Sequence, residues 1–295
     1  MKYATSVFIV LSTLFAQGQT TFYEFEEFSN LPYATGSDSL QRLNLVVPAT
    51  ANPPLLVWIG GGAWSYVNKD MEMDLARKLA REGIAVASVG HRLSSASWRD
   101  PSLTEGVKHP EHIRDIASAV GWLHREKGRF GYDARQMFIG GYSSGGHLAA
   151  LLILDTTYLA DVGFPTKFIK GAVPISGAYD INHYHQVFLS GDNPALAELH
   201  MQAVFGNTEA DFYQASPTSF LENLKIPMLL ISDNTIAQYT QLFEKKIEET
   251  SFKDYEVIYS DSLSHGDLWR NMSYDSISAY RNKMIEFIQS KRSSF

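Results

Sequence analysis

The sequence contains no cysteine among its 295 residues. This absence excludes a disulfide framework, a thiolate nucleophile and a zinc site with cysteine ligands. Stability must therefore come from a hydrophobic core, which a chain of this length can build.

Positive charge is also in short supply, since 25 Lys and Arg residues stand against 32 Asp and Glu residues and give a formal net charge of −7. The chain has no run rich in Lys and Arg. We therefore expect neither nucleic acid nor an anionic membrane surface as its main partner. With 45% hydrophobic and 19% charged residues, the composition is that of a globular protein.

A long apolar run is missing at the N-terminus, where the stretch 4–15 is too short for a confident membrane span. This stretch follows Lys2 and precedes Ala16–Gly18, with small residues at the −3 and −1 positions of a cleavage site. The pattern predicts a cleavable signal peptide over 1–18, so we expect a secreted or periplasmic protein without stable membrane insertion. An uncleaved anchor or a buried N-terminal helix is the alternative.

From residue 43 onwards, short apolar runs alternate with amphipathic stretches. The apolar runs predict strands over 43–47, 55–59, 84–89, 137–139, 172–175, 227–231 and 255–259. The amphipathic stretches predict helices over 71–81, 112–127, 146–154, 236–249 and 276–288. Such alternation is typical of an α/β fold with a mostly parallel sheet and helices on both faces.

The segment 180–222 interrupts this alternation and is too long for a plain connection. We interpret it as a helical insertion, or cap, over the carboxyl ends of the strands. No repeat or linker divides the rest, so residues 19–295 are predicted to form a single domain.

The stretch FIGGYSSGGHLAALL, residues 138–152, is unusually rich in glycine. Within it, residues 141–145 fit the pattern G-x-S-x-G, between a predicted strand and a predicted helix. In that context the serine lies on a sharp turn and its hydroxyl group is exposed, so Ser143 is the predicted nucleophile. A phosphate-binding turn is the alternative, but the stretch lacks the lysine of a P-loop and the G-x-G-x-x-G spacing.

The segment GGYSSGGHLAALL resembles the nucleophile elbow of α/β-hydrolase-fold esterases, specifically the hormone-sensitive-lipase-like and kynurenine-formamidase-like carboxylesterases. Three further segments, LLVWIGGGAW, KHPEHIRDIASAVGWLH and PISGAYDI, resemble the same family in order and spacing. The resemblance covers roughly residues 40–290. It implies an α/β-hydrolase fold and a serine esterase that needs no metal or organic cofactor.

The resemblance also implies an oxyanion hole formed by the backbone N–H groups of Gly62, Ala63 and Ser144. The sequence departs from the family at Gly60, where the family usually has a histidine that orders this loop. A plain tight turn is the alternative interpretation of the three glycines.

A serine nucleophile needs a base, and on this fold the order along the chain is serine, acid, histidine. His265 follows the last predicted strand, on a polar loop before the closing helix, where the family carries its base. Asp233 ends the apolar run PMLLISD at the family's acid position, although the turn there is shorter than usual. Asp180, which follows the preceding strand, is the alternative acid.

Trp64, Tyr142, His183 and Phe188 are candidate walls of a substrate pocket, because they lie close to the predicted catalytic segments or in the insertion. The pair His183 and His185 has the spacing of two metal ligands but no carboxylate pair nearby, so we expect ordinary polar residues and no metal site.

These features predict a secreted serine hydrolase that cleaves carboxylic esters, with small acyl groups favoured and a small molecule or a polysaccharide-linked ester as substrate. One alternative is an arylformamidase-like amide hydrolase, and another is a non-catalytic binding protein on the same fold. The sequence leaves the acyl group, the alcohol and the oligomeric state open.

Overall fold

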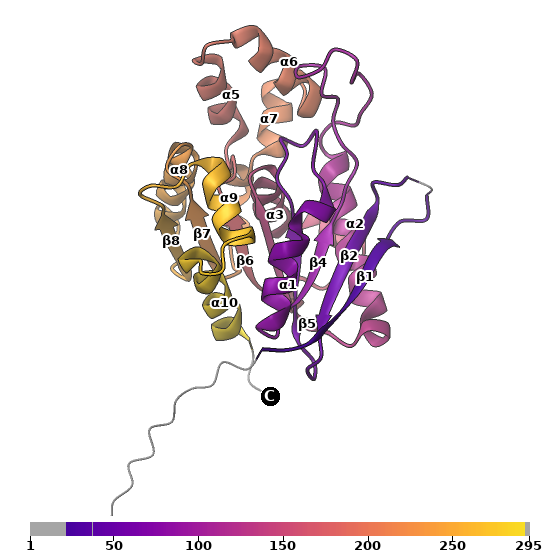
Figure 1. The fold of residues 1–295 in the computed structure, drawn as a ribbon. Helices are drawn as coiled ribbons and strands as arrows, with labels where there is room; N and C mark the ends of the chain where they lie inside the picture. The colour runs from indigo at the N-terminus through magenta and orange to yellow at the C-terminus, as the bar shows by residue number, and fades with distance from the viewer. Residues whose placement is uncertain (1–21, 37, 293–295) are drawn as a thin grey trace, which may run out of the picture.

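The computed structural model describes residues 22–36 and 38–292 (Figure 1). The predicted signal peptide lies outside these residues. The strands are β1 Phe25–Pro32, β2 Arg42–Pro48, β3 Pro54–Ile59, β4 Ala85–Val89, β5 Asp133–Tyr142, β6 Ile169–Ile175, β7 Met228–Ser232 and β8 Tyr255–Tyr259.

The α-helices are α1 Met73–Arg81, α2 Glu111–Phe130, α3 Ser144–Leu154, α4 Thr157–Asp161, α5 Ile181–Leu189, α6 Pro194–Val204, α7 Glu209–Ala215, α8 Ala237–Glu248, α9 His265–Ser273 and α10 Ala279–Lys291. Three short 3₁₀ helices are η1 Lys69–Glu72, η2 Thr166–Phe168 and η3 Pro217–Asn223. In the part of the chain that the structure describes, no helix is long and apolar enough to cross a bilayer.

The strands form one eight-stranded sheet with the order β1-β2-β4-β3-β5-β6-β7-β8. The pairs β1–β2 and β2–β4 are antiparallel, whereas every pair from β4 through β8 is parallel. The predicted mostly parallel sheet is therefore confirmed. Parallel strands end at the same edge, so the loops after β3, β5, β7 and β8 meet there.

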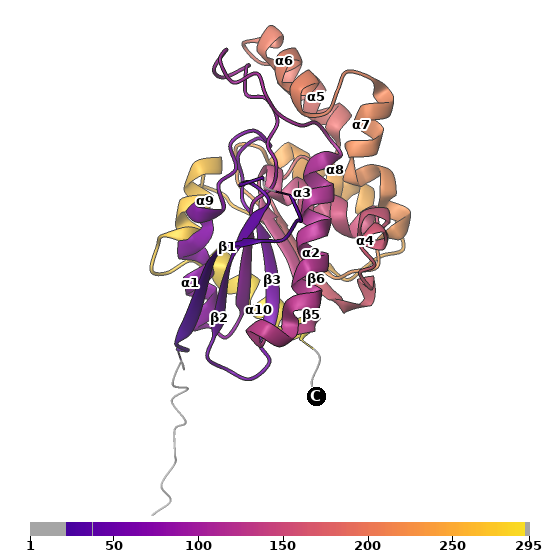
Figure 2. The ribbon, with the colours of Figure 1, turned by 90° about the vertical axis from the view of Figure 1, so that its right-hand side faces the viewer.

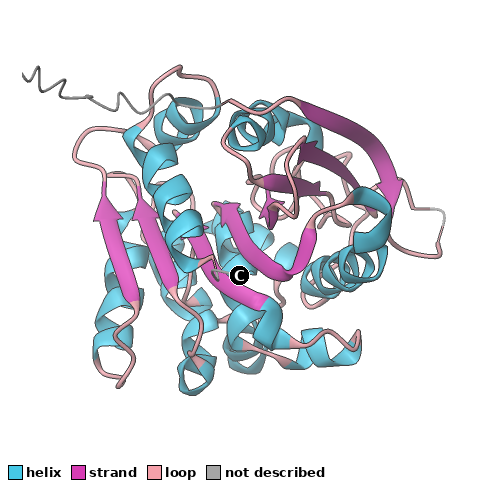
Figure 3. Cartoon of the chain, turned by 90° about the horizontal axis from the view of Figure 1, so that it is seen from below, coloured by secondary structure: helices cyan, strands magenta, loops and turns pink. Residues whose placement is uncertain are grey.

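Two layers of helices cover the sheet because successive side chains of a strand point to opposite faces. In β3, Leu55, Val57 and Ile59 face α2, α3 and α8, whereas Leu56 and Trp58 face α1, α9 and α10. All five side chains are at most 1% exposed. Figures 2 and 3 show the sheet between the two helical layers.

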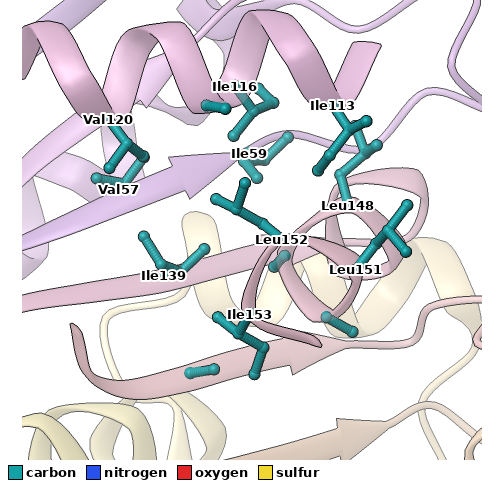
Figure 4. Packing of buried hydrophobic residues seen from close by; sticks show 14 of the residues in the cluster. Val57, Ile59, Ile113, Ile116, Val120, Ile139, Leu148, Leu151, Leu152 and Ile153 are labelled. Carbon is teal, nitrogen blue, oxygen red and sulfur yellow. The ribbon is translucent and has the colours of Figure 1, made fainter. Parts of the chain in front are cut away.

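The larger core lies between the sheet and helices α2 and α3. Ile113, Ile116 and Val120 of α2 recur at helical spacing and pack over β3 and the side chains of α3 (Figure 4). Helix α3 is buried along its whole length, from Ser144 to Leu154. A helix covered on all sides holds its N-terminus in a fixed place, which matters because α3 begins directly after Ser143.

The segment 180–222 contains α5, α6 and α7, which extend beyond the carboxyl edge of the sheet at the top of Figure 1, and most of η3, which packs against α3 and α8. We refer to residues 180–222 as the cap. The sequence analysis did not predict the antiparallel edge strand β1, the helices α4 and α9 or the short 3₁₀ helix η2.

Candidate active site

Ser143 lies on a sharp turn between β5 and α3, as the G-x-S-x-G pattern requires. Its backbone has φ +56° and ψ −120°, a conformation that costs a non-glycine residue about 1–3 kcal/mol. The turn is tightly packed, since a Cβ atom on Gly145 would lie 2.0 Å from the carbonyl oxygen of Ile59. The neighbouring backbone thus leaves no room for a side chain at position 145.

This close approach predicts that Gly145→Ala destabilises the fold by about 1–3 kcal/mol, the usual cost of overpacking. Gly128→Ala is the matched control, because Gly128 lies inside α2 and a Cβ atom there meets nothing within 4 Å. The free energy of unfolding of this control should rise by about 0.5–1 kcal/mol, because alanine has a better helix propensity than glycine. Urea unfolding of both variants measures the difference, and equal midpoints would contradict this account of the turn.

Three side chains from separate elements form a continuous hydrogen-bonded chain at the carboxyl edge of the sheet. His265 Nε2 lies 2.9 Å from Ser143 Oγ, and His265 Nδ1 lies 2.8 Å from Asp233 Oδ2. Asp233 is fully buried, whereas the His265 side chain is 36% exposed. The structure therefore brings together the three residues that the sequence predicts as nucleophile, acid and base.

Asp233 follows β7 and is held by donors on both carboxylate oxygens. Its Oδ1 accepts hydrogen bonds from the Thr235 amide at 2.8 Å, the Thr235 hydroxyl at 2.6 Å and the Ile236 amide at 3.1 Å. Burial by itself would raise the pKa of Asp233, but the side chains of His265, Thr235 and Ser176 outweigh it and hold the pKa well below its usual range. The carboxylate is thus charged and fixed in orientation.

The sequence analysis predicted that His265 lies in a loop. In the structure it is instead the first residue of α9. Ser264 caps this helix by accepting a hydrogen bond from the Asp267 amide. The hydroxyl of Thr235 accepts a hydrogen bond from the His265 amide at 3.2 Å, and the hydroxyl of Tyr142 donates one to the His265 carbonyl oxygen. Thr235 is a site residue that the sequence analysis missed, since a threonine in a short polar turn carries no distinctive signal.

The predicted oxyanion loop lies directly against Ser143. A Cβ atom on Gly61 would lie 3.0 Å from Ser143 Cβ. The loop is strained, with φ +148° at Gly62, +46° at Ala63 and +58° at Trp64. Within residues 22–36 and 38–292, no group accepts a hydrogen bond from the N–H of Gly62 or Ala63.

Ser144 begins α3, so its N–H has no partner inside the helix. The three predicted donors therefore remain available beside the nucleophile. Gly61 and Gly62 line a cavity of about 210 Å³ that opens at Ser143 and His265, and Ala63 and Ser144 each directly follow a lining residue. Its other lining residues are Tyr66, Asn68, Met71, Glu72, Tyr142, Gly266 and Trp269.

Of the four predicted pocket residues, only Tyr142 lines this cavity. Trp64 points away from it and packs against His147, Tyr184, His200 and Phe205. His183 packs on Tyr239, and Phe188 on Tyr184 and His200. Trp64 and His183 thus connect the cap to the rest of the fold, whereas Phe188 packs within the cap. The cavity is walled by residues of the segment 66–72 and by Trp269 instead.

Asp180, the alternative acid, has another role in the structure. Its carboxylate caps α5 through the His183 amide, accepts a hydrogen bond from Thr218 and forms an ion pair with Lys246 at 3.2 Å. Its partners thus lie in the cap and in α8 rather than at Ser143. Within the described ranges, no three His, Asp or Glu side chains are arranged to hold a metal ion.

Comparison with known proteins identifies the family of this chain. Residues 43–241, well over half of the chain, match the BD-FAE family. The chain belongs to that family. The matched range includes Ser143, Asp233 and the Gly60–Gly62 loop, and it ends before His265.

Curated relatives of this BD-FAE member include a kynurenine formamidase of Danio rerio, which is 26% identical over 67% of this chain and 57% of that protein. Esterase LipQ of Mycobacterium tuberculosis is 26% identical over 69% of this chain and 47% of that protein. The chain thus spans about half the length of the curated relatives it matches.

Solved structures share the fold over almost the whole chain. Esterase B from Lactobacillus rhamnosis superposes with a TM-score of 0.75 at 20% identity and covers 90% of this chain and 87% of its own. A carbohydrate esterase from gut microbiota gives a TM-score of 0.74 at 19% identity, with 92% of this chain and 97% of its own covered. The predicted α/β-hydrolase fold is confirmed.

Proposed function

We propose that this protein is a secreted serine hydrolase that cleaves carboxylic esters with small acyl groups. The observation that carries this proposal is the hydrogen-bonded chain from Asp233 through His265 to Ser143, at the mouth of a cavity that the Gly61–Gly62 loop lines. The names of several relatives, which are esterases, support the same class of reaction.

In the proposed reaction, His265 takes the proton of Ser143 as the hydroxyl oxygen attacks the ester carbonyl carbon. The carbonyl oxygen becomes negative and is stabilised by the N–H groups of Gly62, Ala63 and Ser144. His265 then protonates the alcohol as it leaves, and water hydrolyses the acyl-enzyme by the same route. Asp233 stays ionised and keeps the imidazole in the tautomer that can accept the proton.

The size of the cavity supports small acyl groups. A volume of about 210 Å³ is below the range of about 300–1,000 Å³ that is usual for sites of drug-sized ligands. A long acyl chain would therefore have to extend over the exposed side chains of Tyr66 and Met71, which are 47% and 51% exposed.

The test is hydrolysis of p-nitrophenyl esters from acetate to octanoate, combined with labelling by a serine-directed phosphonate. We expect kcat/KM to fall as the acyl chain lengthens, and one phosphonate per protein on the peptide that contains Ser143. Ser143→Ala is the control that should take up no label, because Ser144 Oγ is buried and faces no cavity. Labelling at another residue, or none in an active protein, would refute the assignment of the nucleophile.

A second candidate is hydrolysis of N-formyl aromatic amides, which the similarity to kynurenine formamidases of two fish favours. The same triad could attack a formyl carbon, because the acyl group is smaller still. Turnover of N-formylkynurenine faster than that of p-nitrophenyl acetate would make this the main activity. Absence of turnover on both substrate classes, with no labelling, would leave a non-catalytic binding protein.

The proposal of secretion rests on the sequence pattern of residues 1–18 alone. Expression of the full chain with export machinery should yield a mature protein that begins at Gln19. N-terminal sequencing measures this, and a protein that retains Met1 inside the cell would contradict it.

A further inference from the structure

Glu72 is a buried carboxylic acid beside the candidate active site that the reaction above does not use. It ends η1, is 3% exposed and lines the cavity at Ser143. In the part of the chain that the structure describes, it forms no ion pair with a cationic side chain. Burial raises its pKa, and hydrogen bonds from two tryptophans only partly oppose that rise.

The two partners of Glu72 come from elements on either side of the nucleophile. Trp58 Nε1 donates to Oε2 at 2.8 Å, and Trp269 Nε1 donates to Oε1 at 3.2 Å and to Oε2 at 3.4 Å. Trp58 lies in β3, two residues before the loop that begins at Gly60. Trp269 lies in α9, four residues after His265. Glu72 thus links the strand that leads into the oxyanion loop to the helix that carries the base.

Glu72 also occupies the space beside Gly60. A Cβ atom on Gly60 would lie 3.0 Å from Glu72 Oε1, 3.1 Å from Cγ and 3.3 Å from Cδ. A side chain at position 60 and the present side chain at position 72 therefore compete for the same volume. The space that a side chain at position 60 would fill is thus occupied by the buried carboxylic acid of Glu72, which comes from another element.

We propose that Glu72 is a positioning residue, whose carboxyl group fixes the Gly60–Gly62 loop and His265 relative to each other through Trp58 and Trp269. The inference rests on the proposed function, since it assigns Glu72 a part in keeping that site aligned. Alignment matters because displacing a reacting group by about 1 Å can cost about 100-fold in rate.

Substitution of Glu72 separates positioning from substrate binding. We expect Glu72→Ala to lower kcat for p-nitrophenyl acetate about 10- to 100-fold, with KM unchanged within about threefold. Glu72→Gln should retain more of the kcat than Glu72→Ala, because an amide oxygen in the place of Oε2 still accepts from Trp58, although the NH₂ group then faces Trp269 Nε1. An unchanged kcat in Glu72→Ala, or a rise in KM alone, would overturn the proposal.

A double-mutant cycle tests the link to α9. If Glu72 acts through Trp269, the kcat of Glu72→Ala/Trp269→Phe should equal that of Glu72→Ala, because the second change removes a contact already lost. Trp122→Phe in α2 is the matched control, since Trp122 packs on Phe130 away from the site and should leave kcat unchanged. Losses that multiply in the double mutant would overturn the link.

Position 60 supplies a second test. Gly60→His alone should lower kcat and the melting temperature, because the new side chain meets Glu72. In the double variant Gly60→His/Glu72→Ala the histidine has room. Its kcat should therefore be at least about threefold higher than that of either single variant, whereas two independent substitutions would lower kcat further. A double variant less active than both single variants would overturn the competition for this space.

The role of Glu72 can also be tested if the protein hydrolyses no ester. Should the wild type hydrolyse no ester, the indole N–H signals of Trp58 and Trp269 and the ring signals of His265 can be followed by NMR. Glu72→Ala should then shift all three residues, whereas His265 signals unchanged by that substitution would overturn the proposal. Ester turnover dependent on Ser143 but insensitive to Glu72 would leave the function standing and remove the inference.

Discussion

Asp233→Asn is expected to lower kcat for a short-chain ester by about 10³–10⁴ with little change in the fold. The geometry dictates the orientation of the new amide. The atom in the place of Oδ1 has to accept three hydrogen bonds, two of them from Thr235 and one from Ile236, so it must be the oxygen. The NH₂ group then faces His265 Nδ1 and forces the proton of the imidazole onto Nε2.

An imidazole with its proton on Nε2 cannot accept the proton of Ser143, 2.9 Å away. The loss should therefore appear in kcat, and binding of the substrate should be little affected. Steady-state hydrolysis of p-nitrophenyl acetate gives both constants.

Asp180→Asn is the matched control for this substitution. Asp180 also follows a central strand, but its carboxylate is held by the His183 amide, Thr218 and Lys246. Its replacement removes one ion pair at the base of the cap, and we expect kcat to stay within about threefold of the wild type, as usual for partly exposed pairs. The reverse ranking of the two variants would assign the acid to Asp180.

The sheet and most helices could be predicted because their residues alternate at the period of the element. Leu55–Ile59 is apolar on both faces, as a strand covered by helices must be, and its prediction is confirmed. Strand β1 escaped prediction because it is an edge strand with only partly buried or exposed side chains. Helix α9 escaped because nine residues with Gly266 near the start give only a short apolar stripe.

Apart from Tyr142, the walls of the cavity were not predicted, because they depend on contacts between segments distant in the sequence. Glu72 precedes an amphipathic helix and is indistinguishable there from a surface charge, yet Trp58 and Trp269 enclose it. Trp64 follows the oxyanion loop and was expected to face substrate, but the positive φ angle of this residue turns its side chain toward the cap. Local sequence patterns indicate which residues are buried and where the chain turns. The direction of the side chains in a strained loop depends instead on the residues of other segments that pack against the loop.

Mild acid is expected to destabilise the protein, because several histidines are buried in their neutral form, among them His147 beneath the cap and His200 within it. His147 is 0% exposed and His200 is 1% exposed. Burial lowers the pKa of His147 to about 3 and that of His200 to about 4. In the unfolded chain both groups titrate near a pKa of about 6.5.

For His147 the reason is visible in its hydrogen bonds. Trp64 Nε1 donates to Nδ1 at 3.1 Å, and Nε2 lies 2.7 Å from the carbonyl oxygen of Ala215 in α7. Only a neutral ring with its proton on Nε2 satisfies both neighbours. Protonation of Nδ1 would set two donors against each other inside the core, at the contact between the oxyanion loop and the cap.

The sign of the effect follows from proton binding. Below pH 6.5 the two histidines are protonated in the unfolded chain but stay neutral in the folded chain. The free energy of unfolding therefore falls as the pH is lowered toward the folded pKa values. At pH 5 each of these two histidines should lower the free energy of unfolding by about 2 kcal/mol relative to pH 7.5. Glu72 works in the opposite direction, because its raised pKa favours the folded state as the carboxylate is protonated.

Urea unfolding between pH 7.5 and pH 5 measures this effect, in a range where most carboxylates remain charged. The free energy of unfolding should be nearly constant above pH 7 and fall by at least about 4 kcal/mol at pH 5, because burial also lowers the pKa of His109 and His112, which add to the loss from His147 and His200. His147→Gln keeps an acceptor for Trp64 and a donor for Ala215 but cannot titrate, so the free energy of unfolding of this variant should fall by about 2 kcal/mol less than that of the wild type. A wild-type stability unchanged down to pH 5 would mean that the cap opens to let these rings take up protons before the core unfolds.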